Sequence, residues 1–493
     1  MATNYIAAID LGSSRIAGII GTRSDTGSFT VIACETENSA NCIRRGVIYN
    51  VEQAAFHIKG IIKKLENKVP GLRIAKVYVG VGGQSIRSVD HMVVKSLGAD
   101  GEVTNDIIKE ISNECKNFKP DGLEVLSIES PAFYVDGNYE KNPVGVPCSR
   151  IEARYKLIVC RPSLRKHIVN SITERVKIEI ADIFVSPLAL ADMVLSDEDK
   201  SLGCALVDFG AGVTSLTVFK HKRLVNLWVI PLGSHLITKD ITSLNVVEEE
   251  AERLKKTYGD ATPDREASLP IPMNTTDSMG PRQIQSSELN EVVEARLQEI
   301  LENVYARLEE AELLGNALGA GIIVTGGGAS LKNIENAVFD RFQIDVRPAS
   351  VRKMFSGRTN GTVEPGFGVA VGLFMKGTVN CAPTPAVAAS SKTPVNAVNA
   401  EVHVVDGENI AEDRSELQVP SGTTQPVEDN VNVNRPIKPP KQHKRGLIDK
   451  WAGFANKLFN DEAYDDNKKE IKEVKAGDKE DDGEKKEKRN DIN

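Results

Sequence analysis

The sequence predicts an α/β protein whose core is a duplicated fold. The stretch from Ala205 to Phe219 has an apolar run ending in Asp208, a tight glycine turn, and a segment that alternates polar with apolar residues. This pattern is typical of a β-hairpin. The stretch from Ala7 to Arg15, AAIDLGSSR, repeats the arrangement about 200 residues earlier. Around both hairpins, apolar strands alternate with amphipathic helices, which favours an α/β domain.

Both predicted hairpins contain residues suited to a bound phosphate and its metal ion. Glycines let backbone N–H groups approach an anion closely. An Asp at the strand end, Asp10 or Asp208, can hold a metal-bound water beside that anion. The predicted phosphate-facing residues are Gly12, Ser13, Ser14, Gly210, Ala211, Gly212 and Thr214. One such hairpin is more often only a hairpin, but the pair favours a nucleotide whose phosphates lie between two halves.

Composition narrows the class of protein. The chain has 493 residues, too many for one core, and 41% of them are hydrophobic, which indicates a globular body. A net charge of −8 and a pI of about 5.6 argue against a nucleic-acid partner. Seven cysteines without a C-x-x-C pair indicate a reduced, cytosolic compartment. Neither a signal peptide nor a membrane-spanning helix is expected.

Local patterns predict the elements in chain order. Strands besides the two hairpins are predicted at 29–35, 75–81, 86–94, 123–134, 151–159, 179–184, 224–231 and 345–348. Helices are predicted at 51–67, 104–116, 163–176, 188–195, 233–244, 246–258, 285–315 and 364–374. Thr104 is expected to cap the second helix, and Ser286 or Ser287 the seventh. Residues 197–201 are expected to form a charged connection, and 260–285 to hold short strands between excursions.

Residues 85–165 are predicted to form a small inserted α+β subdomain, because three strand-like pieces surround one helix there. These residues contain no cluster of side chains that would indicate catalysis or ligand binding. The role of the subdomain is either structural support or contact with another protein.

Two later features suit the nucleoside of such a ligand. Glu252 and Lys255 are spaced i, i+3 on one predicted helix, so they share a face. They form either a solvated ion-pair surface or a contact to ribose and base. A buried strand then ends in Gly326, Gly327 and Gly328, before a helix expected to start at Ser330. Glycine backbone at such a turn can lie flat against a planar group.

The chain after about residue 380 differs in composition. Residues 381–443 are rich in Pro, Ala, Val, Ser and Thr and are predicted to be a disordered linker, while 461–493 form a charged, disordered tail. Between them, residues 444–460 are predicted to form an amphipathic helix, either docked on the protein's own core or bound to a membrane. The residues predicted to face the membrane are Leu447, Ile448, Trp451, Phe454, Leu458 and Phe459.

Three glycine turns in this order, with the Glu252/Lys255 helix between the second and third, resemble the actin-type ATPase superfamily over residues 1 to about 376. Within it, the chain is similar to the FtsA family of bacterial cell-division proteins. The insert comes after the first helix and the strand that follows it, as in FtsA, and an amphipathic segment follows a long linker. GVIYN (46–50) and AERLKKTYG (251–259) also resemble FtsA segments. The charged tail after the amphipathic segment departs from that family.

The resemblance implies a two-lobed actin-like fold of duplicated RNase H-like domains. The implied parts are a first core domain (1–84 with 166–203 and 364–380), the insert (85–165), a second core domain (204–240 with 316–363), a small upper subdomain (241–315), the linker (381–443), a membrane-targeting helix (444–460) and the tail (461–493). Glu252, Lys255 and Gly326 to Gly328 are implied to hold the nucleoside, and Asp10 and Asp208 to face Mg²⁺ through water.

The resemblance also implies a function. An FtsA-like protein binds ATP and Mg²⁺, polymerises, and tethers the FtsZ ring to the inner face of the cytoplasmic membrane at the division septum. Its partners would be FtsZ, further copies of itself, membrane lipids and other divisome proteins. Related MreB proteins have a catalytic Glu where this chain has Ser186, so at most weak ATPase activity is expected and no catalytic residue is assigned. The alternatives are a pilus-assembly ATPase and a small-molecule kinase of the same superfamily.

Overall fold

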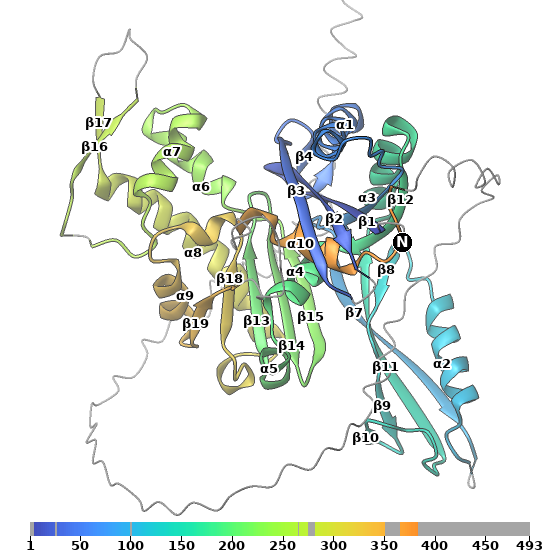
Figure 1. Cartoon of the computed structure of the whole chain (residues 1–493). Coiled ribbons are helices and arrows are strands. Elements are labelled where there is room, and N and C mark those ends of the chain that lie inside the picture. The colour runs from blue at the N-terminus through green and yellow to red at the C-terminus, as the bar shows by residue number, and fades with distance from the viewer. Residues whose placement is uncertain are drawn as a thin grey trace, which may run out of the picture. The chain divides into compact units, whose positions relative to one another are not determined.

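The computed structural model describes residues 4–24, 27–98, 101–264, 266–274, 282–350 and 365–382 (Figure 1). Most of the predicted linker, residues 383–443, the predicted amphipathic helix at 444–460 and the predicted charged tail lie outside the described residues. The linker prediction is wrong for Cys381 and Ala382, which are buried, because the Cys381 N–H donates to the Tyr5 carbonyl at 2.7 Å. Within the described ranges, no helix is both long enough and apolar enough to cross a membrane.

The first half is built on a five-stranded sheet with the order β12-β6-β1-β2-β3. The first hairpin, β1 (Asn4–Leu11) and β2 (Arg15–Arg23), extends antiparallel to β3 (Phe29–Asn38). On the other side, β6 (Lys76–Val81) and β12 (Glu179–Val185) are parallel to β1.

Helices cover both faces of this sheet. An added Cβ at Gly18 would meet Ile61 of α1 (Val51–Lys68), and one at Gly21 would meet Phe374 of α10 (Gly368–Lys376). The small strand residues therefore let a helix pack closely on each side. Helix α4 (Ser186–Val194) lies against α10 and starts with Pro187 in its first turn.

The second half repeats this topology. The second hairpin, β13 (Cys204–Phe209) and β14 (Thr214–Lys220), extends antiparallel to β15 (Arg223–Ile230). On its other side, β18 (Ile322–Thr325) and β19 (Val346–Pro348) are parallel to β13. Both halves thus have three antiparallel strands followed by two parallel ones. The predicted duplicated α/β fold is confirmed.

The insert is an antiparallel sheet with one helix. Its elements are β7 (Arg87–Ser96), α2 (Asn105–Asn117), β8 (Glu124–Ile128), β9 (Ala132–Val135), β10 (Asn138–Glu140) and β11 (Arg150–Cys160). Its sheet joins that of the second half through one pair, Arg87 with Trp228 on β15. The predicted single strand at 123–134 is wrong, because the chain breaks into β8 and β9 before Pro131, which has no N–H for a ladder.

The upper part of the second half contains α6 (His235–Ile241), α7 (Glu248–Tyr258) and the start of α8 (Ser286–Glu310), with the short hairpin β16 (Pro270–Met273) and β17 (Arg282–Gln285). Helix α9 (Ile334–Phe342) instead packs beside β19, in the core of the second sheet (Figure 1). The predicted caps of α8 are wrong. Gln285 is the capping residue, paired reciprocally with Glu288 in a capping box. Helix α9 starts at Ile334 rather than Ser330, since a 3₁₀ turn occupies Gly327–Ser330.

One further prediction is wrong, and two others differ from the structure in detail. Residues Asp197–Leu202 form helix α5 rather than a charged connection, because Ser196 and Asp199 make a capping box that satisfies its first N–H groups. The helix predicted at 163–176 consists of α3 (Pro162–Val169) followed by a π-helical turn, Asn170–Val176. The strand predicted at 29–35 is longer, ending at Asn38.

Candidate functional site

The two hairpin turns have the same backbone shape. A Cβ added to Gly12 would lie 2.7 Å from the carbonyl oxygen of Arg15, three residues later. A Cβ added to Gly210 would lie 2.7 Å from the carbonyl oxygen of Val213, again three residues later. Each glycine follows its Asp by two positions. The duplication therefore extends from the strand order down to the turns.

The turns also approach each other directly. A Cβ on Gly212 would come within 2.4 Å of the Ser13 Oγ and 3.1 Å of the Arg45 backbone nitrogen. No side chain fits between these atoms, so Gly212 is the position where the second turn meets the first. Ser14, at the same turn, is exposed. The structure thus brings together glycines and hydroxyls that the sequence placed almost 200 residues apart.

Asp10 and Asp208, one near the end of each first strand, both have raised pKa values. The pKa of Asp10 is raised to about 7, chiefly by burial and in addition by the charge of Asp208, against the Ser186 hydroxyl and the Arg15 guanidinium, which lower it. Burial likewise raises the pKa of Asp208 to about 6, against a hydrogen bond from Ser215. Two carboxylates in such a place resist ionising together, and a divalent cation would relieve the repulsion.

Ser186 occupies a confined position beside Asp10. Its hydroxyl donates to the Asp10 Oδ1 at 3.2 Å. A Cβ added at Gly80 on β6 would lie 2.6 Å from the Ser186 Oγ and 3.2 Å from that carboxylate oxygen. The hydroxyl therefore orients Asp10, and it supplies no carboxylate that could orient an attacking water.

The first turn is held by the segment between β3 and α1. The Ser39 Oγ donates to the Gly12 carbonyl at 2.6 Å, and the Ser39 N–H to the Ser14 carbonyl at 3.2 Å. On the other side, the Gly46 N–H donates to the Ser13 Oγ at 2.8 Å. Sequence reasoning missed Ser39 and Gly46, because neither belongs to a periodic pattern. It also missed Arg15, whose guanidinium lies 5.8 Å from the Phe367 ring.

The second turn is held by the loop that opens α6. The N–H groups of Ser234 and His235 donate to the carbonyls of Gly210 and Ala211, each at 2.9 Å. Thr214 is buried, and its hydroxyl donates to the Leu232 carbonyl at 2.8 Å. The structure therefore gives Thr214 a partner within its own half, where it fastens the turn. Its predicted contact to phosphate would require that hydrogen bond to be exchanged.

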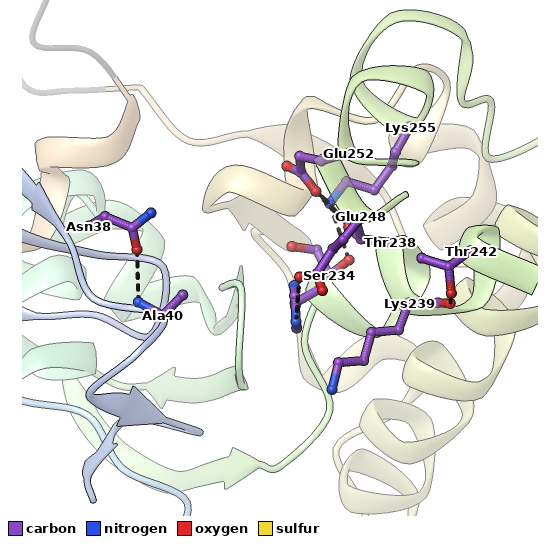
Figure 2. A network of polar contacts seen from close by, with 10 residues as sticks. Asn38, Ala40, Ser234, Thr238, Lys239, Thr242, Glu248, Glu252 and Lys255 are labelled. Carbon is purple, nitrogen blue, oxygen red and sulfur yellow. Dashed lines mark hydrogen bonds and ion pairs between the residues drawn. The ribbon is translucent and has the colours of Figure 1, made fainter. Parts of the chain in front are cut away.

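Glu252 and Lys255 form a partly buried network rather than a solvated surface (Figure 2). The Lys255 ammonium donates to the Glu252 carboxylate at 2.6 Å, the Thr238 hydroxyl at 2.8 Å and the Ser234 carbonyl at 3.2 Å. These acceptors use all three of its protons. The network reaches the second turn through Ser234, which donates to Gly210.

Burial of this network shifts the pKa of both charged groups. Burial lowers the pKa of Lys255 despite the neighbouring Glu252. Burial would raise the pKa of Glu252, but hydrogen bonds from Lys255 and Thr238 outweigh it, and the net shift is downward. The hydrogen bonds fix the two side chains against each other, so the pair can position a ligand group that lies against α7.

The three glycines after β18 lie against the second turn. Gly326 has a left-handed φ of +88°, and an added Cβ would meet the Asp208 Oδ1 at 2.3 Å. Gly328 lies against Phe209 and Ser234. Gly327 is exposed and has no atom within 4 Å of an added Cβ. The turn thus presents open backbone at Gly327 beside the carboxylate of the second hairpin.

The metal predicted at this site would depend on few protein ligands. No group of three or more His, Cys, Asp or Glu residues that could hold a metal is found in the described part of the chain. Mg²⁺ usually keeps several waters and binds through one or two carboxylates plus substrate phosphates. Asp10 and Asp208 fit that donor set.

Comparison with known proteins identifies relatives of similar sequence. Residues 205–372 match the family described as cell division protein FtsA, and residues 83–159 match the SHS2 domain inserted in FtsA. The chain is 37% identical over 348 residues to the cell division protein FtsA of Porphyromonas gingivalis, covering 70% of this chain and 72% of that protein. It is 30% identical over 374 residues to that of Bacillus subtilis, covering 74% and 82%.

A solved structure shows the same fold at low sequence identity. A chain of the PilM-PilN type IV pilus biogenesis complex aligns with a TM-score of 0.53 and 13% identity, covering 75% of this chain and 98% of that one. At this identity the likeness concerns the fold alone.

Proposed function

Because the chain belongs to the FtsA family of bacterial cell division proteins, we propose that it is the ATP-binding, filament-forming tether between the FtsZ ring and the cytoplasmic membrane. The family places the chain in cell division with an actin-like fold, as the sequence resemblance implied. The observation that supports nucleotide binding best is the matched pair of turns, which meet at Ser13 and Gly212.

The bound species in this proposal is Mg-ATP. Gly12, Ser13, Gly210 and Gly212 line the place where the phosphates would lie. Asp10 and Asp208 would hold the Mg²⁺ ion through its waters, and the ion would neutralise charge that the carboxylates and phosphates share. The nucleoside would lie against α7 and the open backbone at Gly327.

Calorimetric titration with Mg-ATP tests this site. Wild type should bind, binding should require Mg²⁺, and Asp208→Ala should remove most of it. Asp90→Ala is the matched control, since that carboxylate lies exposed in the insert beside Lys156. Absence of heat with wild type, or an unchanged Asp208→Ala titration, would contradict the proposal.

Hydrolysis should be slow in this protein. The group beside Asp10 is the Ser186 hydroxyl, which can orient Asp10 but cannot accept a proton from water as a carboxylate could. ATP would then act mainly as a structural ligand that fixes the two halves. A turnover near the enzyme median of about 10 per second would contradict this.

We place the FtsZ contact on the upper part of the second half, residues 241–315 with the adjoining α6. A hollow with a volume of about 480 Å³ lies there between α6 and α8. Its lining combines polar and charged groups with small apolar ones: Lys239, Asp240, Thr242, Ser243, Val292 and Ala295. Such a groove suits a short peptide with an apolar anchor. Val292→Glu should weaken binding of an FtsZ C-terminal peptide, and Val247→Glu, exposed and outside that lining, should not.

The proposed membrane anchor is residues 444–460. Trp451 and Phe454 would insert at the acyl boundary, and Lys450 would meet anionic head groups at about 1 kcal/mol for each such cation. Trp451→Glu with Phe454→Glu should abolish co-sedimentation with anionic liposomes, while Tyr464→Glu, beyond the helix, should leave it unchanged. Equal sedimentation of the double variant and wild type would exclude this anchor.

Filament contacts are assigned to the insert in the same proposal. Deleting 85–165 should abolish filaments and leave Mg-ATP binding intact. Unchanged filaments would refute the assignment.

A pilus-assembly ATPase of the same superfamily is the alternative function, and the fold likeness to a chain of the PilM-PilN complex does not separate it from the first. Such a protein has no need of an amphipathic segment at 444–460. The liposome experiment therefore separates the two functions.

A further inference from the structure

A small hairpin between β3 and α1 reaches both phosphate turns. Its strands are β4 (Ile43–Arg44) and β5 (Val47–Ile48), joined by Arg45 and Gly46. Both turn residues have left-handed backbones, with φ of 48° and 71°. A two-residue hairpin turn of this kind needs positive φ at both positions. Glycine adopts it freely, but for arginine it is uncommon and costs free energy.

The tip of this hairpin is fixed in place. The Gly46 N–H donates to the Ser13 Oγ, and the Gln84 N–H donates to the Arg45 carbonyl at 3.1 Å. A Cβ on Gly46 would lie 2.1 Å from the Gly82 carbonyl oxygen. The Arg45 nitrogen lies 3.1 Å from the Cβ position of Gly212. Arg45 is therefore held at the junction of the two turns.

The Arg45 side chain makes no polar contact that stabilises the described part of the fold. It is half-buried, yet it makes no hydrogen bond, ion pair or ring contact with the described residues. The neighbouring cations differ: the Arg44 guanidinium lies 4.2 Å from the Tyr49 ring, and that of Arg15 lies 5.8 Å from the Phe367 ring. Arg45 therefore carries a guanidinium without a partner among the described residues, on a backbone that lies where the two turns meet.

We propose that Arg45 binds the terminal phosphate of the nucleotide and makes the protein prefer ATP to ADP. This inference rests on the proposed function. The nucleoside network of Lys255 is bonded to the second turn through Ser234. No hydrogen bond joins the first turn, with Ser13 and Arg45, to that network among the described residues, so we expect this turn to meet the phosphate farthest from the nucleoside. A planar guanidinium binds phosphate oxygens in pairs.

The strained backbone supports the assignment. A glycine or asparagine at position 45 would meet the turn's conformational demand at lower cost. An arginine there is explained by its side chain rather than by its backbone. Strain of this kind gathers at ligand-binding sites.

The test compares the affinity of Arg45 variants for Mg-ADP and for Mg²⁺ with a non-hydrolysable ATP analogue, by calorimetry. Arg45→Asn tolerates the left-handed backbone and removes the charge. It should weaken binding of the analogue by about 10- to 100-fold, as expected for a lost charged hydrogen bond. Binding of ADP should change by less than about threefold. Arg45→Lys should fall between, because ammonium cannot bind in the paired geometry.

Arg44→Asn is the matched control, since that exposed cation lies one residue away and faces Tyr49. It should leave both affinities within about twofold. Equal losses for ATP analogue and ADP in Arg45→Asn, at an unchanged melting temperature, would overturn the proposal, as would no loss of either. If Arg45→Asn retains the wild-type ratio while Asp208→Ala loses all binding, Arg45 fails and the proposed function stands. A wild-type chain that binds neither nucleotide overturns both.

Discussion

The first and second hairpin turns have one shape but different supports. The first is fastened by the extended segment before α1, through Ser39 and the Arg45–Gly46 tip. The second is fastened by the opening of α6, through Ser234. Only the second turn is continuous with the Glu252/Lys255 network. Duplication thus preserved the shape of the turns, while the support of the second turn differs by its link to the Glu252/Lys255 network.

The glycines beside the two carboxylates give the sharpest contrast between the halves. Gly326 has a left-handed φ, and a Cβ there would collide with the Asp208 carboxylate. We expect Gly326→Ala to lower the free energy of unfolding by about 2–4 kcal/mol and to abolish Mg-ATP binding.

Gly80, beside Asp10 in the first half, tests the same feature more gently. Its φ is not left-handed, and its nearest contacts are side-chain atoms of Ser186 and Leu373 rather than backbone atoms. Gly80→Ala should cost about 1–2 kcal/mol. Gly327→Ala is the control, at about 0.5 kcal/mol or less, because nothing surrounds it. Chemical denaturation of the three variants measures the order, and equal losses would refute it.

The Lys255 network should be the next most sensitive feature. Lys255→Met leaves the acceptors of Glu252, Thr238 and Ser234 with one partner fewer in a buried place. We expect a loss of about 2–3 kcal/mol, since removing one member of a buried ion pair is costly. Lys256→Met removes an exposed cation that also contacts Glu252 at 3.1 Å. It should cost about 0.5 kcal/mol or less. Thermal unfolding of both variants makes the comparison, and a similar loss in each would show that Lys255 is not special.

The sequence predicted the two turns because a hairpin is local. Asp10 and Gly12, or Asp208 and Gly210, lie within a few residues of each other, so their pattern survives in the printed sequence. The supports could not be predicted in this way. Ser39 and Gly46 contact the first turn from 27 and 33 residues away in sequence, and they lie in a loop without periodicity.

The errors in the predicted secondary structure have a similar origin. Helix α5 is only six residues long. Its charged residues predict a connection more strongly than its capping residues predict the start of a helix. The hydrogen-bond partners of Thr214 and Lys255 could not be predicted, because they lie on other segments of the chain. The residue types indicated donors, but only the structure shows that Leu232, Ser234 and Thr238 already accept them.

The two carboxylates should make nucleotide binding depend on pH. Their pKa values of about 7 and about 6 lie above that of an ordinary Asp. A cation needs them ionised, so Mg-ATP affinity should fall roughly tenfold from pH 8 to pH 6 as Asp10 takes up its proton. Calorimetry across this range measures the slope, and Asp10→Asn should flatten it. An affinity independent of pH would contradict the shared site.

The stability of the nucleotide-free protein should change in the opposite direction. Both folded pKa values are raised, so the native state binds more protons than the unfolded state between about pH 4 and pH 7. The free energy of unfolding contributed by this pair therefore falls as pH rises through that window. Opposite slopes for stability and for Mg-ATP affinity would identify the same carboxylates in both measurements.

The smallest effect on stability is expected for a matched pair of variants, one in each half, each of which removes one hydroxyl group. Ser39→Ala removes the buried hydrogen bond to the Gly12 carbonyl, and Thr214→Val removes that to the Leu232 carbonyl. Each should cost about 1 kcal/mol, because each leaves one carbonyl short of a donor. Ser14→Ala, at an exposed position of the first turn, is the control and should be neutral. Each turn then keeps two backbone donors, the Ser234 and His235 N–H groups in the second half and the Ser39 and Gly46 N–H groups in the first. Calorimetry with Mg-ATP should therefore give similar small drops in affinity for the two variants. A larger drop in Mg-ATP affinity for Thr214→Val than for Ser39→Ala would show instead that the Thr214 hydroxyl turns to the phosphate when the ligand binds.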